Sequence, residues 1–248
     1  MKVTVITVCR NAAAHIDETI RSVIAQDHPD IEHIVIDGGS TDGTQERVRR
    51  YSECIARFVS EKDAGVYDAM NKGLRLATGE VVAFVNAGDM IATRDTVSRM
   101  AEAFGQQGVD AVYGDVLMVD PGDIHKVKRF WKGGAYRREN FRKGWMPPHP
   151  GTYFRKSAYD RFGLFNTDLV VGADYELMFR MLYRHRLHAR YIPHVAVRFR
   201  LGGMSNASMA HVLKANVEVR RSWQLNGFQA PPLLVTRKLW SKVLQFLH

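Results

Sequence analysis

Strand-like and helix-like segments alternate along the first hundred residues, and this alternation constrains the fold more than any other feature. Residues 3–9 form an unbroken apolar run rich in β-branched side chains, which is typical of a strand buried on both faces. Further strands are expected at 34–36, 58–60 and 81–85, and helices around 16–24, up to residue 51, at 67–76 and at 97–104. Short loops join these segments, so the sequence predicts an α/β fold with a mostly parallel sheet and helices on both faces.

The pattern changes after about residue 110, where turn residues and aromatic residues become frequent. Residues 111–119 and 126–130 are typical of antiparallel strands around a Pro121-Gly122-Asp123 turn. The remaining elements that we expect are a helix from Asp174 to about His185, a strand at 195–199 and a helix at 209–223. The 248 residues show no internal repeat, so we expect one domain with a C-terminal appendage.

The two halves of the chain carry opposite charge, which the total of +9 conceals. Residues 1–123 contain 12 Lys and Arg against 20 Asp and Glu, a net charge of −8, whereas residues 124–248 contain 23 against 6, a net charge of +17. A basic half of this strength indicates an anionic partner. No stretch approaches about 18 consecutive apolar residues, and the first residues enter a strand without the features of a signal peptide. With two cysteines and no disulfide framework, the sequence predicts a soluble cytoplasmic protein.

Polar residues cluster where two of the predicted strands end. Residues 37–42 (DGGSTD) follow the second strand, and residues 86–89 (NAGD) follow the fourth. Ligands of parallel sheets bind beyond the carboxyl ends of the strands, so we expect a site there. The Asp37 carboxylate can accept hydrogen bonds from a base N–H or a ribose hydroxyl, and Asp89 beside a glycine suits Mg²⁺ or Mn²⁺ bound to a diphosphate. Each segment is also typical of an ordinary polar turn, and the residues alone leave both interpretations open.

A third polar segment, residues 60–73 (SEKDAGVYDAMNKG), leads into a predicted helix. Lys72 can neutralise a phosphate there, while Tyr67 and Asp68 can hold a base or a sugar. The alternative is a helix N-terminus with solvated charges. The chain contains no G-x-x-x-x-G-K-[ST] phosphate loop and no G-x-G-x-x-G after the first strand, which excludes the commonest nucleotide-binding motifs.

Seven segments together carry a resemblance to a known family. They are Val5–Asn11, IDGGSTDGT (36–44), DAGVYDAMNKG (63–73), FVNAGD (84–89), HPGTYFRKS (149–157), GADYELMFR (172–180) and RLGGMSN (200–206). In this order they resemble glycosyltransferase family 2, and within it the bacterial exopolysaccharide and O-antigen (colanic-acid-type) transferases. The resemblance implies a GT-A fold with a Rossmann-like sheet. It implies one domain over 1–228, with a nucleotide-binding half at 1–110 and an acceptor-binding half at 111–228.

The resemblance also implies a reaction. Members of the family transfer a sugar with inversion from a nucleotide-diphosphate donor to a saccharide or lipid-linked acceptor, here in surface polysaccharide synthesis. Asp174 matches the general base of the family. Asp37, with Asn11 beside it, matches the acid that reads the nucleotide base, and Lys72 would lie near the base or the phosphates. Asp89 matches the last acid of the metal-binding cluster, which implies Mn²⁺ or Mg²⁺ as the cofactor.

The chain departs from the commoner family pattern at this metal cluster. Asn86-Ala87-Gly88-Asp89 stands where D-x-D-D is usual, so two of three acids are missing. We therefore expect weak metal binding by Asp89, with a neutral His149 as an additional ligand. The other candidate substrate contacts are Tyr67, Asn86, Arg198 and Arg200. A buried packing role is the alternative for His149, and an exposed strand face is the alternative for the two arginines.

The C-terminal segment 229–248 is expected to form a basic amphipathic helix. Its residues 233–248 can lie on an anionic membrane surface, pack on the domain or form a dimer contact, and the sequence leaves these alternatives open. A membrane contact would place the protein at the inner face of the cell membrane. Two other functions remain alternatives, an inactive sugar-nucleotide-binding module and a basic nucleic-acid-binding protein. The basic residues form no compact arm or recognition motif, so we expect no nucleic acid partner.

Overall fold

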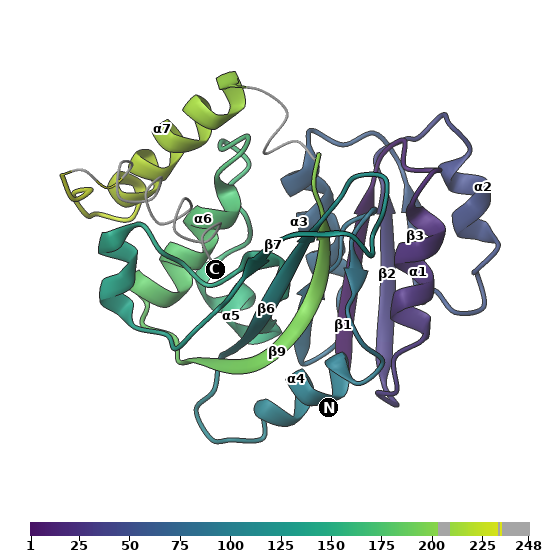
Figure 1. The fold of residues 1–248 in the computed structure, drawn as a ribbon, viewed down its shortest axis with the longest axis horizontal. Helices are drawn as coiled ribbons and strands as arrows, with labels where there is room; N and C mark the ends of the chain where they lie inside the picture. The colour runs from purple at the N-terminus through teal and green to yellow at the C-terminus, as the bar shows by residue number, and fades with distance from the viewer. Residues whose placement is uncertain (203–208, 233, 235–248) are drawn as a thin grey trace.

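A nine-stranded sheet with helices on both faces forms the centre of the protein (Figure 1). The computed structural model describes residues 1–202, 209–232 and 234, without the side chains of 209–212. The strands are β1 Val3–Cys9, β2 Ile31–Asp37, β3 Arg57–Ser60, β4 Val81–Phe84, β5 Met90–Ile91, β6 Ala111–Val119, β7 Val127–Trp131, β8 Thr152–Arg155 and β9 Ala189–Arg200. Their order is β3-β2-β1-β4-β8-β6-β9-β5, and β7 pairs with β6. The predicted α/β fold is confirmed.

The helices alternate with the strands in the first half and gather together in the second. The α-helices are α1 Ile16–Ile24, α2 Thr44–Arg49, α3 Val66–Leu76, α4 Thr96–Ala103, α5 Lys156–Phe162, α6 Ala173–Met178 and α7 Met209–Leu225. The other helical segments are the 3₁₀ helices η1 Arg138–Lys143 and η2 His149–Gly151, and the π-helix η3 Phe179–Arg184, which continues α6. In Figure 1 the helices α5, α6 and α7 lie together on one side of the molecule, and α1 and α2 lie on the other.

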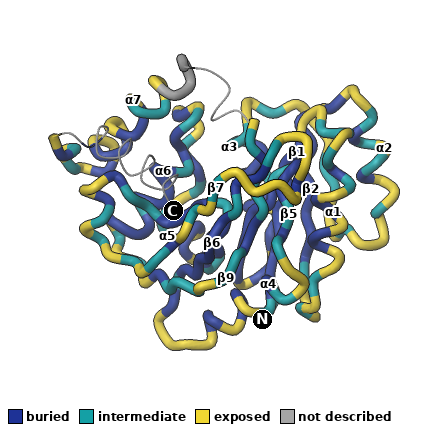
Figure 2. Tube along the Cα trace, viewed as in Figure 1, coloured by how far each residue is buried: buried dark blue, intermediate teal, exposed yellow. Residues whose placement is uncertain are grey.

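Strand β1 shows why this sheet requires an unbroken apolar run. Ile6 and Val8 face the core cluster that contains α3, α5 and α6, whereas Val3 and Val5 face the cluster that contains α4. Because successive side chains of a strand point to opposite faces, both sets must be apolar when both faces are covered. In Figure 2 the central strands are coloured dark blue, as buried residues, over most of their length.

The sheet combines a parallel half and a mixed half. Strands β3, β2, β1 and β4 pair in parallel, as the sequence predicts. Strand β8 then pairs antiparallel with both β4 and β6, while β9 runs parallel to β6 and β5 antiparallel to β9. The antiparallel pair of β6 and β7 also confirms the expected hairpin around Pro121.

Two strands are longer than their apolar patterns suggest. Strand β2 begins at Ile31, three residues before the apolar run, because its polar residues are buried with partners. Glu32 accepts a hydrogen bond from Thr4 Oγ1 at 2.6 Å, and the His33 ring lies 3.0 Å from Thr7 Oγ1. Strand β9 begins at Ala189 instead of residue 195, because it pairs along the full length of β6.

Helix α7 lies where a helix was expected at 209–223. Among the described residues, no helix has the length and apolar composition needed to cross a membrane. Most of the predicted C-terminal helix, residues 233 and 235–248, lies outside the described residues, as do residues 203–206 of the RLGGMSN motif.

Candidate functional site

The carboxylate of Asp37, at the end of β2, is fully buried and surrounded by donors. It accepts hydrogen bonds from Ser40 N at 3.0 Å, from Ser60 Oγ at 2.6 Å and from Ser40 Oγ. Burial raises the pKa of Asp37, but the bonds from Ser40 and Ser60 outweigh it and hold the pKa below the usual value. With no exposed surface, Asp37 organises the loop after β2 in this structure. The direct contact of Asp37 with a nucleotide base stays a prediction, and in this structure its carboxylate bonds serine donors of the protein.

Asn11 joins the loop after β1 to this same region. Its N–H donates to Ser40 Oγ at 2.7 Å, and its Oδ1 accepts a hydrogen bond from Thr41 N at 3.0 Å. Its φ of 49° lies in the left-handed region, which asparagine tolerates better than most residues. The structure thus brings Asn11 and Asp37 together through Ser40, and Asn11 is exposed enough to contact a ligand.

The Asp63 side chain lies against Gly38, in the loop that follows β2. A Cβ atom at Gly38 would lie only 2.3 Å from Asp63 Oδ2. The other oxygen, Oδ1, accepts a hydrogen bond from Gly65 N at 3.0 Å, and the side chain is partly exposed. Asp63 is therefore the partly exposed carboxylate at the open end of β2, and Gly38 leaves the room that it needs.

Helix α3 carries the predicted residues Tyr67, Asp68 and Lys72. Asp68 accepts a hydrogen bond from Ala64 N at 3.0 Å, and thereby satisfies a backbone donor at the start of the helix. Lys72 Nζ lies 2.9 Å from Glu61 Oε1 and donates to the Lys62 carbonyl at 3.1 Å, so acidic and carbonyl oxygens already surround it. Asp68 and Lys72 follow Asp63 by five and nine residues, but both have protein partners in this structure.

Tyr67 points away from that loop, toward the second half of the chain. Its hydroxyl donates to the Val171 carbonyl at 2.7 Å, three residues before Asp174. Burial raises the pKa of Tyr67 well above its usual value, and the charge of Asp174 raises it further. Tyr67 therefore connects α3 to the start of α6, and it brings the predicted base into the same site.

Four rings, those of Tyr67, Phe84, His149 and Phe165, form an aromatic cluster. The rings of Phe84 and His149 stack with centroids 6.1 Å apart, and Phe165 contacts both of them and Tyr67. Asn71 holds Phe165 in place, because its side-chain amide bonds both the N–H and the carbonyl of Phe165 at 2.9 Å. His149 is 8% exposed; burial lowers its pKa, while the charge of Asp174 opposes this shift.

Asp174 is the partly exposed residue in an otherwise buried stretch. Residues 172, 173 and 175–179 are buried, and Asp174 lies on the open side of this turn. Its Oδ1 accepts a hydrogen bond from Tyr175 N at 2.7 Å. The Tyr67 hydroxyl bonds the Val171 carbonyl three residues before Asp174, and the charge of Asp174 raises the pKa of Tyr67 and opposes the lowering of the pKa of His149 by burial.

The turn after β4 places Asp89 differently from the expectation. The Asp89 side chain is 5% exposed, and Oδ1 accepts a hydrogen bond from Arg200 N at 2.9 Å. Burial raises the pKa of Asp89 to about 8. Asn86 differs, because its buried Oδ1 has no hydrogen-bond partner among the described residues. This geometry does not favour Asp89 as the exposed metal ligand, and it leaves Asn86 as the oxygen without a partner.

The two arginines of β9 also have different environments. The Arg200 guanidinium donates to the carbonyls of Gly88 at 3.0 Å and Pro121 at 2.8 Å, and it pairs with Glu18 at 2.6 Å. Its donors thus hold the turn after β4 and the turn at Pro121 in this structure, and the expected contact of Arg200 with the donor diphosphate stays a prediction. Arg198 makes a single long contact of 3.4 Å with the Ile124 carbonyl among the described residues, and it remains a candidate.

Comparison with known proteins decides the family. The model for glycosyl transferase family 2 matches residues 4–163. A PGL/p-HBAD biosynthesis glycosyltransferase of Mycobacterium bovis is 31% identical over 201 residues, which cover 79% of this chain and 76% of that protein. The chain belongs to glycosyltransferase family 2. An uncharacterized glycosyltransferase of Mycobacterium tuberculosis is 32% identical to this family 2 glycosyltransferase over 188 residues, 72% of this chain and 68% of that protein.

Solved glycosyltransferases share the fold of this family 2 enzyme. A mannosyltransferase from Pyrobaculum calidifontis, in complex with GDP-Man and Mn²⁺, superposes with a TM-score of 0.67 at 24% identity, covering 98% of this chain and 69% of that chain. TarS of S. aureus with UDP-GlcNAc gives 0.69 at 19% identity, covering 91% and 65%. Glucosyl-3-phosphoglycerate synthase of Mycobacterium tuberculosis, with Mn²⁺ and UDP, gives 0.64 at 17% identity, covering 89% and 80%. The expected GT-A fold is confirmed.

Sequence reasoning assigned no role to three residues of the candidate site in this glycosyltransferase. Asp63, Asn71 and Phe165 all lie in it, and the first two belong to the DAGVYDAMNKG segment that was singled out for other members. The glycine at 38, directly after the strand-end acid, was a signal for Asp63, because a missing side chain leaves space for another. No local pattern pointed to Phe165, because Asn71, which bonds its backbone, lies 94 residues earlier in the chain.

Proposed function

We propose that this glycosyltransferase moves a sugar, with inversion, from a nucleoside-diphosphate donor to a saccharide or lipid-linked acceptor of surface polysaccharide synthesis. Residues 1–110 would form the nucleotide-binding half of the domain 1–228, and residues 111–228 the acceptor-binding half. The observation that carries the proposal is the 2.7 Å hydrogen bond from Tyr67 to the Val171 carbonyl. It joins α3 to the segment before Asp174, which supports a proposed base beside the place where a donor would bind.

In the proposed mechanism Asp174 accepts the proton of the acceptor hydroxyl as that hydroxyl attacks the anomeric carbon. A carboxylate within hydrogen-bond reach serves as such a general base. Attack from the face opposite the leaving diphosphate inverts the anomeric centre. Burial lowers the pKa of His149 and so favours its neutral form, in which one ring nitrogen can orient a hydroxyl. Phe84 and Phe165, which pack against His149, keep water from this side of the site.

Donor recognition follows from the partly exposed groups at the ends of β1 and β2. We assign the base or ribose contact to Asp63, supported by Asn11, with Asp37 behind them as the organiser of the loop. A carboxylate accepts hydrogen bonds from the N–H groups of a base or from ribose hydroxyls. Lys72 and Asp68 remain near the base or phosphates in this proposal, and Arg198 remains a contact for the diphosphate.

Removal of the Asp63 carboxylate is expected to weaken donor binding with little effect on kcat. A hydrogen bond to a charged group contributes about 1.5–3 kcal/mol, so Asp63→Ala should raise the donor KM about 10- to 100-fold. Steady-state kinetics with varied donor concentration measures this change. Glu53→Ala, which removes an exposed carboxylate beyond α2, is the matched control and should leave KM unaltered. An unchanged donor KM in Asp63→Ala would show that Asp63 does not contact the base or ribose and that other residues make this contact.

Two of the solved neighbours bind Mn²⁺, and the turn after β4 fits a divalent cation in one limited way. Among the described residues, no three His, Cys, Asp or Glu side chains are grouped to hold a metal. The Asn86 Oδ1 atom, buried without a partner, is a suitable neutral oxygen ligand. We propose that it would hold a Mn²⁺ or Mg²⁺ ion that arrives with the donor diphosphate. The ion would offset charge on the leaving diphosphate.

The two candidate ligands can be separated by metal titration. Asn86→Ala is expected to raise the Mn²⁺ concentration for half-maximal transfer at least about tenfold, because it removes a ligand oxygen. Asp89→Asn should leave that midpoint within about twofold, since its carboxylate already bonds Arg200 N. Transfer rates measured after chelation and stepwise addition of Mn²⁺ check both values. A larger shift in Asp89→Asn than in Asn86→Ala restores Asp89 as the ligand.

The activity itself is tested with a panel of UDP- and GDP-sugars and a lipid-diphosphate-linked saccharide acceptor. We expect turnover of one donor, with an inverted anomeric centre in the product as read by NMR. A nucleotide that raises the Tm without any transfer would favour the inactive binding module. Binding of oligonucleotides alone would favour a nucleic-acid-binding protein.

Peripheral contact of residues 233–248 with the inner face of the membrane is a further part of the proposal, and vesicle sedimentation of a chain lacking them tests it.

A further inference from the structure

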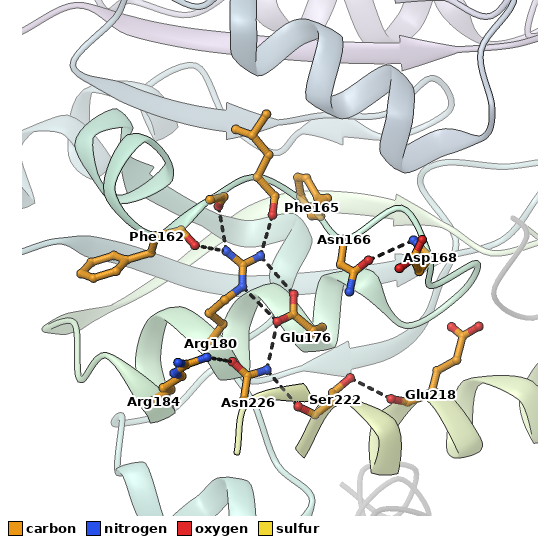
Figure 3. Close-up of polar contacts among 12 residues, drawn as sticks. Phe162, Phe165, Asn166, Asp168, Glu176, Arg180, Arg184, Glu218, Ser222 and Asn226 are labelled. Atoms are coloured by element: carbon orange, nitrogen blue, oxygen red, sulfur yellow. Dashed lines mark hydrogen bonds and ion pairs between the residues drawn. The ribbon is translucent and has the colours of Figure 1, made fainter. Parts of the chain in front are cut away.

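Helix α7 contributes one acidic side chain to the loop in front of Asp174. Glu218 is 5% exposed, and its two carboxylate oxygens accept three consecutive backbone N–H groups. Oε1 accepts from Val170 at 3.1 Å, and Oε2 accepts from Val171 at 2.9 Å and Gly172 at 2.7 Å. Figure 3 shows the Glu218 side chain extending from α7 toward the loop that carries Asp168. These charge-assisted bonds fix the backbone of three residues at once.

The fixed segment lies between two groups of the site. The carbonyl of Val171 accepts the Tyr67 hydroxyl, and Asp174 follows Gly172 by two residues. The fit is close, because a Cβ atom at Gly172 would lie 3.0 Å from the Cβ of Glu218. Glu218 therefore fixes the backbone position of residues 170–172. Asp174 follows this loop by two residues, so the position of the loop sets the position of Asp174.

Helix α7 and the residue that follows it also form hydrogen bonds with α6, at the two residues after Asp174. Trp223 Nε1 donates to the Tyr175 hydroxyl at 3.0 Å, and the Asn226 amide donates to Glu176 Oε1 at 3.0 Å. Figure 3 shows the second of these contacts, together with the Ser222 hydroxyl that donates to the Glu218 carbonyl at 2.7 Å. Asp174 thus lies between two attachment points of one helix, and the carboxylate of Glu218 forms the attachment on its N-terminal side.

We propose that Glu218 is a positioning residue for transfer: it holds the loop 170–172 so that the Asp174 carboxylate lies within reach of the acceptor hydroxyl. This inference rests on the proposed function, because it assigns the role of the general base to Asp174. A base that is misplaced by about 1 Å loses on the order of 100-fold in rate, although substrate binding is preserved. Glu218 acts through the backbone and touches neither donor nor acceptor in this assignment.

Glu218→Gln keeps the shape of the side chain but removes its charge and one of its acceptor oxygens. We expect kcat to fall about 10- to 100-fold while the donor KM stays within about twofold, because the donor groups of β1 and β2 are untouched. Gly172→Ala is a second variant, which pushes the loop away from Glu218 and leaves the carboxylate intact. It should produce the same split between kcat and KM, so the inference stays testable if Glu218→Gln folds poorly.

Ser222→Ala is the matched structural control. It removes a buried hydrogen bond of the same helix, one turn from Glu218, without altering the loop, and its kcat should equal that of the wild type. Equal loss of kcat in Ser222→Ala and Glu218→Gln would reduce Glu218 to a general stabiliser of α7. A rise in donor KM without a fall in kcat would likewise overturn the inference.

A double variant separates this inference from the proposed function. If Glu218 acts through Asp174, then Asp174→Asn with Glu218→Gln should be no slower, within about twofold, than Asp174→Asn alone. Multiplied losses would overturn the positioning role while leaving Asp174 as the base. Full activity of Asp174→Asn alone would overturn the proposed base, and the inference with it.

Discussion

Asp174→Asn is expected to reduce kcat about 100- to 10,000-fold, the usual contribution of a general base. The substitution is nearly isosteric, and an asparagine Oδ1 can still accept the hydrogen bond from Tyr175 N that the aspartate accepts at 2.7 Å. The fold and the donor pocket should therefore remain intact. Thermal unfolding and the binding of nucleoside diphosphate should match those of the wild type. Only the step that removes the acceptor proton loses its base.

Single-turnover transfer of a radiolabelled sugar measures the effect directly, because it isolates the chemical step. Asp168→Asn is the control, since Asp168 is an exposed aspartate six residues earlier on the same loop. It should transfer at the wild-type rate. If Asp174→Asn retains the wild-type rate while folded, another group must take the proton, and the neutral His149 would be the next candidate.

Of the substitutions proposed here, Arg180→Met is expected to produce the largest decrease in the free energy of unfolding. The guanidinium contacts both oxygens of Glu176, at 2.9 and 3.0 Å, and also bonds the carbonyls of Gly163 at 2.8 Å, Leu164 at 2.6 Å and Phe162 (Figure 3). Side-chain exposure is 12% for Arg180 and 4% for Glu176. Removal of one partner of a buried pair leaves an uncompensated charge, which costs about 3–5 kcal/mol.

At about 2–4 °C per kcal/mol for a chain of this size, Arg180→Met should lower the Tm by about 6–20 °C. The matched control is Arg99→Met, because Arg99 pairs with Asp95 at the same i,i+4 spacing but on the surface. An exposed pair of this kind contributes only about 0.3–0.5 kcal/mol. Adding Glu176→Gln to Arg180→Met should recover part of the loss. Equal Tm shifts in the two single variants would show that burial does not decide the strength of this pair.

Much of the fold could be predicted from the sequence because it depends on local patterns of side chains. The apolar run of β1 predicted a strand covered on both faces, and the alternation of strands and helices predicted a parallel sheet with its site at the carboxyl ends. The antiparallel pair of β6 and β7 was also predicted from its turn. The first residues of β2 and β9 were not, because Glu32 and Arg190 are polar and only their neighbours in the sheet make them strand residues.

For the candidate site, the sequence predicts the segments, whereas the orientation of their side chains comes from the structure. Asp37 and Asp89 come at the predicted strand ends, but each is turned into the protein, toward serine donors in one case and toward β9 in the other. Asp63 was passed over although its segment was recognised, because its role depends on the empty space at Gly38. Whether a carboxylate faces a ligand or a protein donor depends on what lies opposite, and a local motif does not contain that information.

By itself, then, the sequence determined the α/β fold and the family, and it predicted the segments of the candidate site. These properties rest on the periodicity of side chains and on motifs a few residues long, which are local. The tertiary structure decided which polar groups remain partly exposed, as Asp63 and Asp174 do. It also decided which are buried with hydrogen-bond partners inside the protein, as Arg200 and Glu218 are. The partners of Arg200 and Glu218 lie 46 to 182 residues away, and only folding brings such donors and acceptors within hydrogen-bond distance.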